Sequence, residues 1–547
     1  MSKPYYLTTP IYYVNGSAHI GHIYTTTLAD CIARYHRLCD EETFFLTGCD
    51  EHGMKVQQTA EQNGVDTQQW CDKIADTFKT AFADFHITQF DRFIRTTDKD
   101  HIQTAQKLWI KLQDNGHIYK AKYEGWYCIS DECFVTELNV HDAEKDGKTV
   151  KVNEDGNLCV WHSEENYMFR LTSFKQQLLE YYANNDIITP KFRQDEIIQL
   201  IQEHLQDVSI SRSQAKIHWG IPVPNDPEHV MYVWIDALSN YLTGANYFTN
   251  NTAWPANVHI LGKDIIRFHC IYWPAFLMGA GIELPLHFLV HGWWVAKNGQ
   301  KMGKSLGNAT SPQELADGFG IDALKYYMLS EASPDSDGII SGELVCAKLN
   351  ADLANALGNL LNRCVVEKIL PGQIVPECNI EDFAQFKILI DNVEGLYATV
   401  NDAMIHYKTK DALFAIFAQV YAVNNFLQMN EPWKLIKTDI KKYNSVMFTA
   451  ISLLRIIGIL LLPFMPDKME ELLRQLGIPE DEWKINQKNL KFLVLKMGQK
   501  IGTEKAILFQ RVILKEEEVE KPVQKKKEPK VKKSKAVKEA VQEEKQE

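Results

Sequence analysis

Two short clusters of basic side chains stand far apart in the sequence and are suited to the same chemistry. His19 and His22 are separated by Ile-Gly, and Lys301 and Lys304 are separated by Met-Gly. Two imidazoles three residues apart share one face of a helix, and a helix N-terminus adds exposed N–H groups and a positive dipole end. Two lysines on a loop can follow a pyrophosphate as it leaves. Both clusters therefore predict contact with phosphate.

Each cluster alone also has an ordinary explanation. His-x-Gly-His is short enough to occur by chance, and an isolated Lys-x-x-Lys turn is most often a solvated surface loop. We favour the chemical interpretation because the two clusters occur together, on either side of a split α/β pattern. Gly21 leaves the backbone open to a ligand at the first cluster, and Ser305 adds a hydroxyl to the second.

The segments that must position the first cluster alternate between strand and helix. Residues 5–14 are rich in Tyr, Thr and Ile, which favours a buried strand. Apolar side chains recur at helical spacing over residues 21–38, and residues 42–47 again favour a strand. This order predicts a βαβ unit and a parallel, Rossmann-like sheet. Three later segments predict the second half of the same sheet: 231–235, 259–262 and 287–290.

The sequence pattern changes twice more along the 547 residues, a length that predicts several domains. Cysteines, acidic residues and short β-like runs predict an insertion in the middle of the chain. The later part of the chain has a helical pattern. The chain ends in a Lys/Glu-rich segment with few apolar residues. We therefore expect five parts: an α/β catalytic domain in two halves (1–116 and 221–321), an inserted connective domain (117–220), an all-α region (322–514) and a disordered tail (515–547).

Bulk properties narrow the environment of the protein. The net charge of −12 means that nucleic acid must bind at local patches. The 11 cysteines form no recognisable disulfide framework, which is typical of a reducing compartment. No secretory or transit segment is recognisable at the N-terminus, and the apolar stretch 451–464 is interrupted by Arg455 and is too short to span a bilayer. We expect a cytoplasmic protein outside the membrane.

Longer motifs surround both clusters. TTPIYYVNGSAHIGH (residues 8–22) and KMGKSLGN (301–308) resemble the paired signatures of class I aminoacyl-tRNA synthetases. Five further segments are similar to the methionyl members of that family: TGCDEHG (47–53), YVWIDALSNY (232–241), GKDIIRFH (262–269), VHGWW (290–294) and NEPWKL (430–435). The resemblance runs from about residue 4 to about residue 514.

The resemblance implies a two-step reaction. The carboxylate of L-methionine attacks the α-phosphate of ATP, which carries Mg²⁺, and the resulting adenylate acylates the terminal adenosine of tRNA(Met). Such displacements depend on positioning and on stabilising charge more than on a nucleophilic side chain. By resemblance, His19, His22, Lys301 and Lys304 are the catalytic residues. The implied ATP-binding residues are Gly21, Gly262, Asp264, Lys304 and Ser305.

The amino-acid pocket is also assigned by resemblance. The matching positions are Ile11, Tyr13, Asp50, Trp234, Ala237, Tyr241 and His291. The residue types agree with this assignment, because a carboxylate pairs with an α-ammonium group and aromatic rings suit a thioether. The alternative is that Trp234 and Tyr241 are ordinary core residues, which is the more frequent case for any single aromatic residue.

Four residues of the expected insertion form a candidate zinc site. Cys128, Cys133, Cys159 and His162 have the spacing C-x4-C and C-x2-H, and three thiolates with one imidazole suit a closed tetrahedral site. Related enzymes that carry a zinc knuckle here usually build it from C-x2-C pairs. Asp131 stands where a second cysteine would be expected, so free thiols are the alternative.

Anticodon recognition is expected from the helical region. Pro432 favours a helix start and would present Trp433 at its outside, where an aromatic ring can stack on an unpaired base. Asn350 and Asn355 are candidate partners for base edges. The alternative for Trp433 is a place in the core between helices.

Other classes of protein fit less of the chain. A small-molecule nucleotidyltransferase would leave residues 322–514 without a purpose, and a non-catalytic tRNA-binding relative would be free to lose the four basic residues, which are all present. A class I synthetase specific for another amino acid is a further alternative. The absence of a recognisable folded domain after residue 514 favours a monomer.

Overall fold

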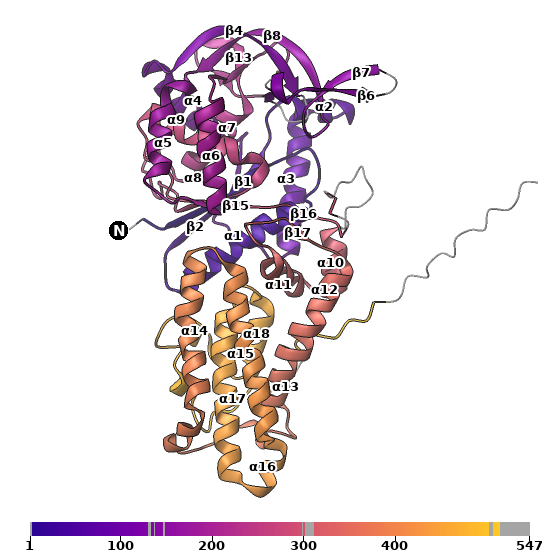
Figure 1. Cartoon of the computed structure of the whole chain (residues 1–547), viewed down its shortest axis with the longest axis vertical. Helices are drawn as coiled ribbons and strands as arrows, with labels where there is room; N and C mark the ends of the chain where they lie inside the picture. Colours follow the sequence, from indigo (N-terminus) through magenta and orange to yellow (C-terminus); the bar gives the residue numbers. More distant parts are fainter. Residues whose placement is uncertain are drawn as a thin grey trace, which may run out of the picture. The chain divides into compact units, whose positions relative to one another are not determined.

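The computed structural model describes residues 3–128, 133–135, 137–145, 148–297, 299–300, 311–502 and 507–514. The chain divides into two compact units, residues 1–512 and 513–547. All described helices and strands belong to the first unit (Figure 1).

A six-stranded sheet is the centre of the catalytic half. Every neighbouring pair in it is parallel, so the carboxyl ends of its strands meet at one edge. β1 and β14 are neighbours although about 245 residues separate them in sequence, as the split α/β pattern predicted. The order is β3 (Arg92–Arg95), β2 (Thr43–Asp50), β1 (Tyr5–Tyr13), β14 (Val258–Gly262), β15 (Phe288–His291) and β9 (Ile188–Thr189).

Helices cover both faces of this sheet. Successive residues of β1 point to opposite sides, with Leu7 in one hydrophobic cluster and Tyr6 in the other. The first cluster includes α1 (Ile20–Leu38) and α3 (Thr67–Asp84). The second includes α4 (Lys99–Asp114), α5 (Lys175–Ala183), α6 (Lys191–His204), α7 (Val233–Leu238), α8 (Asn240–Gly244) and α9 (Trp273–Ala280). The Rossmann-like fold is thereby confirmed.

Antiparallel sheets lie between the two halves of the catalytic sheet in sequence. The larger has the order β5-β4-β8-β7-β6, with β10 (Val208–Ser209) beside β8. Its bounds are β4 (Ile118–Cys128), β5 (Cys133–Val135), β6 (His141–Lys145), β7 (Lys148–Val152) and β8 (Leu158–Phe169). A smaller sheet contains β11 (Ser211–Ser213), β13 (Asp226–Met231) and β12 (Pro222–Val223).

The strand predicted over residues 231–235 is wrong. β13 ends at Met231 and belongs to the small antiparallel sheet, and the helix α7 begins at Val233. The run Tyr-Val-Trp-Ile has strand-like composition, but every residue of α7 is buried. Packing on all sides of a short helix produces the same apolar run as a buried strand, and tertiary contacts override local propensity.

The later part of the chain is mainly helical, as predicted. Its helices are α10 (Pro312–Phe319), α11 (Ile321–Glu331), α12 (Gly342–Lys348), the π-helical η6 (Leu349–Gly358), α13 (Asn359–Val365), α14 (Lys387–Ile405), α15 (Thr409–Asn430), α16 (Pro432–Thr438), α17 (Ile440–Leu461) and α18 (Pro466–Gln475) (Figure 1). One parallel strand pair, β16 (Trp294–Val295) and β17 (Gly338–Ile339), ties this part to the segment after β15.

The helix α17 is the centre of the helical bundle. By length and composition, Thr409–Thr438 and Ile440–Leu461 could each cross a membrane, so the apolar stretch is longer than the sequence interpretation allowed. However, 94% of the apolar window of Ile440–Leu461 is buried inside the protein, as expected for a core helix. Arg455 in this helix is fully buried, and its Nη2 donates hydrogen bonds to the carbonyl oxygens of Asn489 and Lys491 at 2.5 and 2.8 Å.

Candidate active site

The first basic cluster forms the N-terminal cap of α1. The ring of His19 accepts a hydrogen bond from the backbone N–H of Gly21 at 3.1 Å, and His22 Nδ1 accepts one from the backbone N–H of His19 at 3.3 Å. The two imidazoles stack with their centroids 3.6 Å apart. A Cβ on Gly21 would stand 3.0 Å from His19. The motif therefore builds a tight helix start with both rings on one face, as its spacing predicted.

The carboxyl edge of the sheet brings further predicted residues together. Tyr13 at the end of β1 is in register with Asp50 at the end of β2, and Gly262 at the end of β14 is in register with His291 at the end of β15. Ligands of open parallel sheets bind at this edge, beside the point where the strand order reverses. Here that point lies between β1 and β14.

His291 connects this edge to the signature helix. Its Nε2 is hydrogen-bonded to Thr25 Oγ1 at 2.8 Å, and its ring meets Tyr24 edge-on at a centroid distance of 5.0 Å. Burial lowers the pKa of His291, which favours a neutral ring. The neutral imidazole therefore lies between β15 and the second turn of α1.

An aromatic cluster surrounds the predicted methionine pocket. Trp234 stacks on Phe268 at a centroid distance of 3.7 Å, and His269 meets Trp234 edge-on at 6.0 Å. The hydroxyl of Tyr241 is hydrogen-bonded to His269 Nε2 at 2.7 Å. Trp234, Ala237 and Tyr241 are all buried, and within the described residues the indole N–H of Trp234 has no hydrogen-bond partner.

Sequence analysis missed Phe268 and His269. Both lie at the start of a π-helical turn, Phe268–Tyr272, a conformation that is often found at functional sites. Burial lowers the pKa of His269 from 6.5 to about 4, so the ring is neutral near pH 7. Nδ1 donates to the carbonyl of Ile265 at 3.0 Å, which leaves Nε2 to accept from Tyr241. The motif GKDIIRFH ends in these two residues and was the available signal.

The second basic cluster lies outside the described residues. Lys301, Lys304 and Ser305 all belong to the undescribed residues 301–310. The base of their loop is described: Val295 in β16 pairs with Ile339 in β17. Asp264 lies one residue beyond Lys263, whose Nζ donates to Asp337 at 2.7 Å.

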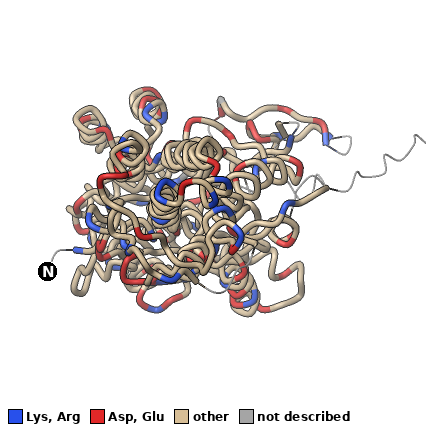
Figure 2. The backbone as a smooth tube through the Cα atoms, turned by 90° about the horizontal axis from the view of Figure 1, so that it is seen from below, with Lys and Arg blue, Asp and Glu red and all other residues tan. Residues whose placement is uncertain are grey.

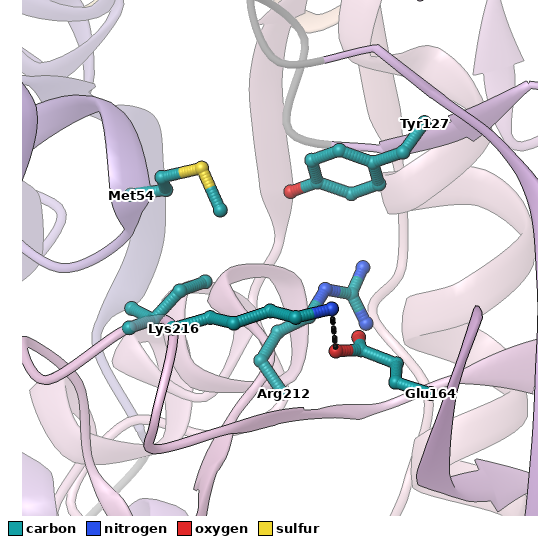
Figure 3. A pocket seen from close by; sticks show the side chains of 6 residues that line it. Met54, Tyr127, Glu164, Arg212 and Lys216 are labelled. Carbon is teal, nitrogen blue, oxygen red and sulfur yellow. Dashed lines mark hydrogen bonds and ion pairs between the residues drawn. The ribbon is translucent and has the colours of Figure 1, made fainter. Parts of the chain in front are cut away.

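A small pocket lies between Met54 and the connective sheets (Figure 3). Lys216 Nζ donates to Glu164 at 3.2 Å within it. The buried guanidinium of Arg212 lies over the Tyr232 ring at 4.2 Å. Met54, the first residue of α2 (Met54–Gln62), lies on the opposite side of the pocket and directly follows the DEHG segment. Charged groups of both signs therefore line this small pocket.

The candidate zinc ligands share neighbouring strands. Cys128 on β4 is in register with Cys133 on β5 and with Cys159 on β8, so three cysteine positions follow one another across the sheet. Cys128 Sγ accepts a hydrogen bond from Asn153 at 3.7 Å, and Cys159 Sγ donates one to the carbonyl of Asn157 at 3.6 Å. The side chains of Cys133 and His162 lie outside the described part of the structure. Among the side chains that are described, no group of three metal-binding residues is found.

The three predicted anticodon residues lie on two elements, Asn350 and Asn355 on η6 and Trp433 on α16, and differ in their surroundings. Pro432 begins α16 as predicted, and Trp433 beside it is half-buried. Asn350 exchanges two hydrogen bonds with the backbone of Val512, at 2.7 and 3.0 Å, so its amide anchors the returning chain. Asn355 is exposed on η6, and its carbonyl accepts a hydrogen bond from Asn359. Among these, Trp433 and Asn355 are accessible to a partner.

This split parallel sheet, with a histidine signature at the start of α1, defines a class I aminoacyl-tRNA synthetase. Residues 5–365 match the family described as tRNA synthetases class I (M), and residues 377–526 match the anticodon binding domain of methionyl tRNA ligase. The chain belongs to the methionyl-tRNA synthetase family.

Individual relatives agree over most of the chain. The methionine–tRNA ligase of Caldanaerobacter subterraneus is 41% identical over 94% of this chain and 80% of the relative, and that of Rhizobium meliloti is 40% identical over 88% and 93%. Among solved structures, the Mycobacterium tuberculosis methionyl-tRNA synthetase in complex with methionyl-adenylate has a TM-score of 0.87 and 37% identity, and the match covers 93% of this chain and all of that chain.

Proposed function

We propose that the protein activates L-methionine with ATP and transfers the methionyl group to tRNA(Met). In the first step the methionine carboxylate oxygen forms a bond to the α-phosphorus, and the bond from that phosphorus to the β-phosphate bridge breaks, which releases pyrophosphate. In the second step a hydroxyl of the terminal adenosine replaces AMP at the methionyl carbonyl. The observation that carries this proposal is the buried cluster of Trp234, Tyr241 and the neutral His269.

The pocket residues divide the recognition of methionine. Asp50, buried at the end of β2, pairs with the α-ammonium group, and Tyr13 lies next to it in register. Trp234, Ala237 and Tyr241 enclose the thioether, with Ile11 at the sheet edge. A neutral pocket favours methionine over charged or strongly polar side chains, because buried polar groups without partners cost free energy.

Phosphate contacts come from the signature helix and the second cluster. His19 and His22 offer imidazole donors at a helix N-terminus, where anions are stabilised, and His291 braces the helix. Gly21 lets the nucleotide approach the backbone, and Gly262 with Asp264 lies on the ribose side. Lys301, Lys304 and Ser305 follow the leaving pyrophosphate. Magnesium bound to the phosphates neutralises part of their charge.

An amino-acid survey tests the function. Exchange of labelled pyrophosphate into ATP should depend on methionine and on no other proteinogenic amino acid, and tRNA(Met) should then accept the methionyl group. Exchange that depends on another amino acid would show a synthetase of different specificity. No exchange, with tRNA binding retained, would show a non-catalytic relative.

We propose that the connective cysteines are protonated thiols that hold no zinc. Cys159 Sγ lies 3.6 Å from the carbonyl oxygen of Asn157, a contact that suits a thiol, whereas a zinc ligand must be a thiolate. Elemental analysis of protein purified without chelator should find no zinc, and Cys159→Ser should fold normally. About one zinc per chain would instead show that Cys128, Cys133, Cys159 and His162 close a metal site.

We also propose a cytoplasmic monomer without membrane association. Among the described residues, the eight cysteines outside the connective sheets form no disulfide, which fits a reducing compartment. Light scattering coupled to gel filtration checks the oligomeric state.

A further inference from the structure

The segment Asp50–Gly53 begins with Asp50, the predicted partner of the ammonium group. Each of the three residues that follow Asp50 is held in place by its own contacts or backbone conformation. Glu51 is fully buried, and Arg95 Nε donates to its carboxylate at 2.5 Å. The indole of Trp219 donates to the backbone carbonyl of Glu51 at 2.5 Å, and Gly53 N–H donates to the carbonyl of Trp219 at 3.1 Å. Gly53 has φ 112°, a conformation that side chains disfavour.

The remaining residue of the segment, His52, has a different kind of partner. Its Nδ1 donates to Asp236 Oδ2 at 2.7 Å, and His101 Nε2 on α4 donates to Asp236 Oδ1 at 2.8 Å. The side chains of Asp236 and His101 are 0% exposed, and that of His52 is 7% exposed. Burial by itself would raise the pKa of Asp236, but the two imidazoles hold it below its usual value. Both carboxylate oxygens are therefore used in a dry environment.

Asp236 stands among the residues that enclose the methionine side chain. It lies on α7 between Trp234 and Ala237, and Tyr241 follows on α8. His101 Nδ1 also reaches Thr243 Oγ1 on α8 at 3.1 Å. The hydrogen bonds His52–Asp236, His101–Asp236 and His101–Thr243 thus connect the ammonium-binding segment, α4, α7 and α8. Contacts of this kind are short and directional, so they fix distances between elements.

We infer that Asp236 is a specificity-determining positioning residue. Through His52 and His101 it sets the distance between the Asp50 carboxylate and the aromatic pocket on α7 and α8. Because Asp50 anchors the ammonium group of the amino acid, this distance selects for the length of the amino-acid side chain. The inference rests on the proposed function of the same site. Asp236 itself does not touch the substrate.

The experiment compares methionine with analogues of different length. Asp236→Asn keeps the shape of the side chain but removes its charge, so one imidazole loses its acceptor and α7 can move relative to Asp50. One methylene in an apolar pocket is worth roughly 10- to 200-fold in discrimination. For this variant we expect the kcat/KM ratio of methionine over ethionine, and of methionine over homocysteine, to fall by about tenfold. The KM for methionine should rise, while the KM for ATP stays within about twofold.

Two further variants keep the inference falsifiable. Asp322→Asn is the matched control, because Asp322 is a buried aspartate on α11 that accepts from Lys468 N–H, away from α7. It should lower the melting temperature without changing either ratio. If Asp236→Asn does not fold, His101→Gln decides, since it removes one of the two imidazoles and should shift both ratios in the same direction.

The outcomes separate this inference from the proposed function. The inference would be overturned if the kcat/KM ratios were unchanged in folded Asp236→Asn or His101→Gln. It would also be overturned if Asp322→Asn shifted the ratios equally. The proposed function would still be upheld in both cases if the unmodified protein showed methionine-dependent exchange. An unmodified protein without such exchange would overturn both.

Discussion

Histidine is used in two opposite ways in this site. His19 is exposed at a helix N-terminus, where it can donate to an approaching phosphate. His269 and His291 are buried, and burial lowers the pKa of each. Because the side-chain type is the same, the environment alone decides whether the ring meets a charged ligand or forms part of a neutral pocket.

Removal of the exposed imidazole should affect chemistry more than binding. We expect His19→Ala to lower the rate of methionine-dependent pyrophosphate exchange on the order of 10² to 10³-fold, since such donors mainly stabilise the transition state. The KM for methionine should change little. His406→Ala, which removes an exposed histidine at the end of α14, serves as control. Near-normal exchange by His19→Ala would remove this residue from the mechanism.

Removal of the buried imidazole should change the pH dependence of stability. The folded pKa of His269 is about 4 and its ordinary value is 6.5, so between these values only the unfolded chain takes up the proton. Stability from this group is complete above pH 6.5 and is lost as the pH falls towards 4. His269→Gln should therefore reduce the loss of unfolding free energy between pH 7 and pH 5 by about 2 kcal/mol. Urea unfolding at both pH values measures this, and an unchanged difference would contradict a neutral His269.

At the scale of single elements, α16 separates the recognition of tRNA from catalysis. It starts at Pro432 after a left-handed Glu431 with φ 44°, and this sharp break places Trp433 in the first turn. Trp433 is half-buried, while Leu435 and Ile436 pack against the core. A ring held by a short helix and open on one side can stack on an unpaired base.

The role of Trp433 can be measured by comparing the two steps. Trp433→Ala should leave methionine-dependent exchange intact and weaken aminoacylation, because loss of one base stack costs about 1–3 kcal/mol. Phe414→Ala, which removes an exposed aromatic ring near the start of α15, should change neither step. An equal fall in exchange and aminoacylation would place Trp433 in the core.

Periodicity and motif spacing in the sequence correctly predicted the long elements near the first histidine cluster. β1 and α1 were predicted within one or two residues, because β1 is a run of strand-favouring residues and α1 is long enough for its apolar residues to recur at helical spacing. The strand predicted over residues 231–235 was wrong, because a short helix that is buried on all sides has no polar face from which its helical period could be recognised. His269 was missed for another reason: its partner Tyr241 comes from a different element, and such pairings are not encoded in local spacing.

At the scale of the whole molecule, charge is distributed evenly over the body and unevenly beyond it. Figure 2 shows acidic and basic residues interspersed along the described chain. Residues 515–547 instead contain 11 Lys and 9 Glu, with nine Lys and one Glu between positions 521 and 538. A solubilising segment is one explanation. Such a basic run can also attract tRNA phosphates without reading sequence.

A truncation distinguishes these explanations. A chain that ends at Leu514 should keep full methionine activation. Its apparent KM for tRNA should rise at low salt, and the difference from the full chain should shrink as salt increases, because counterions screen lysine–phosphate contacts. Identical tRNA kinetics for both proteins at low salt would leave only the solubilising role.

Buried Arg455 also affects how readily its helix could insert into a membrane during synthesis of the chain. The helix Ile440–Leu461, whose most apolar 18-residue window has a mean hydropathy of 1.8, leaves the ribosome before Asn489 and Lys491, whose carbonyls later accept from Arg455. During that interval the helix resembles a segment that membrane-insertion machinery accepts. An arginine deep in a helix opposes insertion by up to about 2.5–3.5 kcal/mol. The side chain that later anchors residues 489–491 thus also raises the free-energy cost of placing this helix in a lipid bilayer.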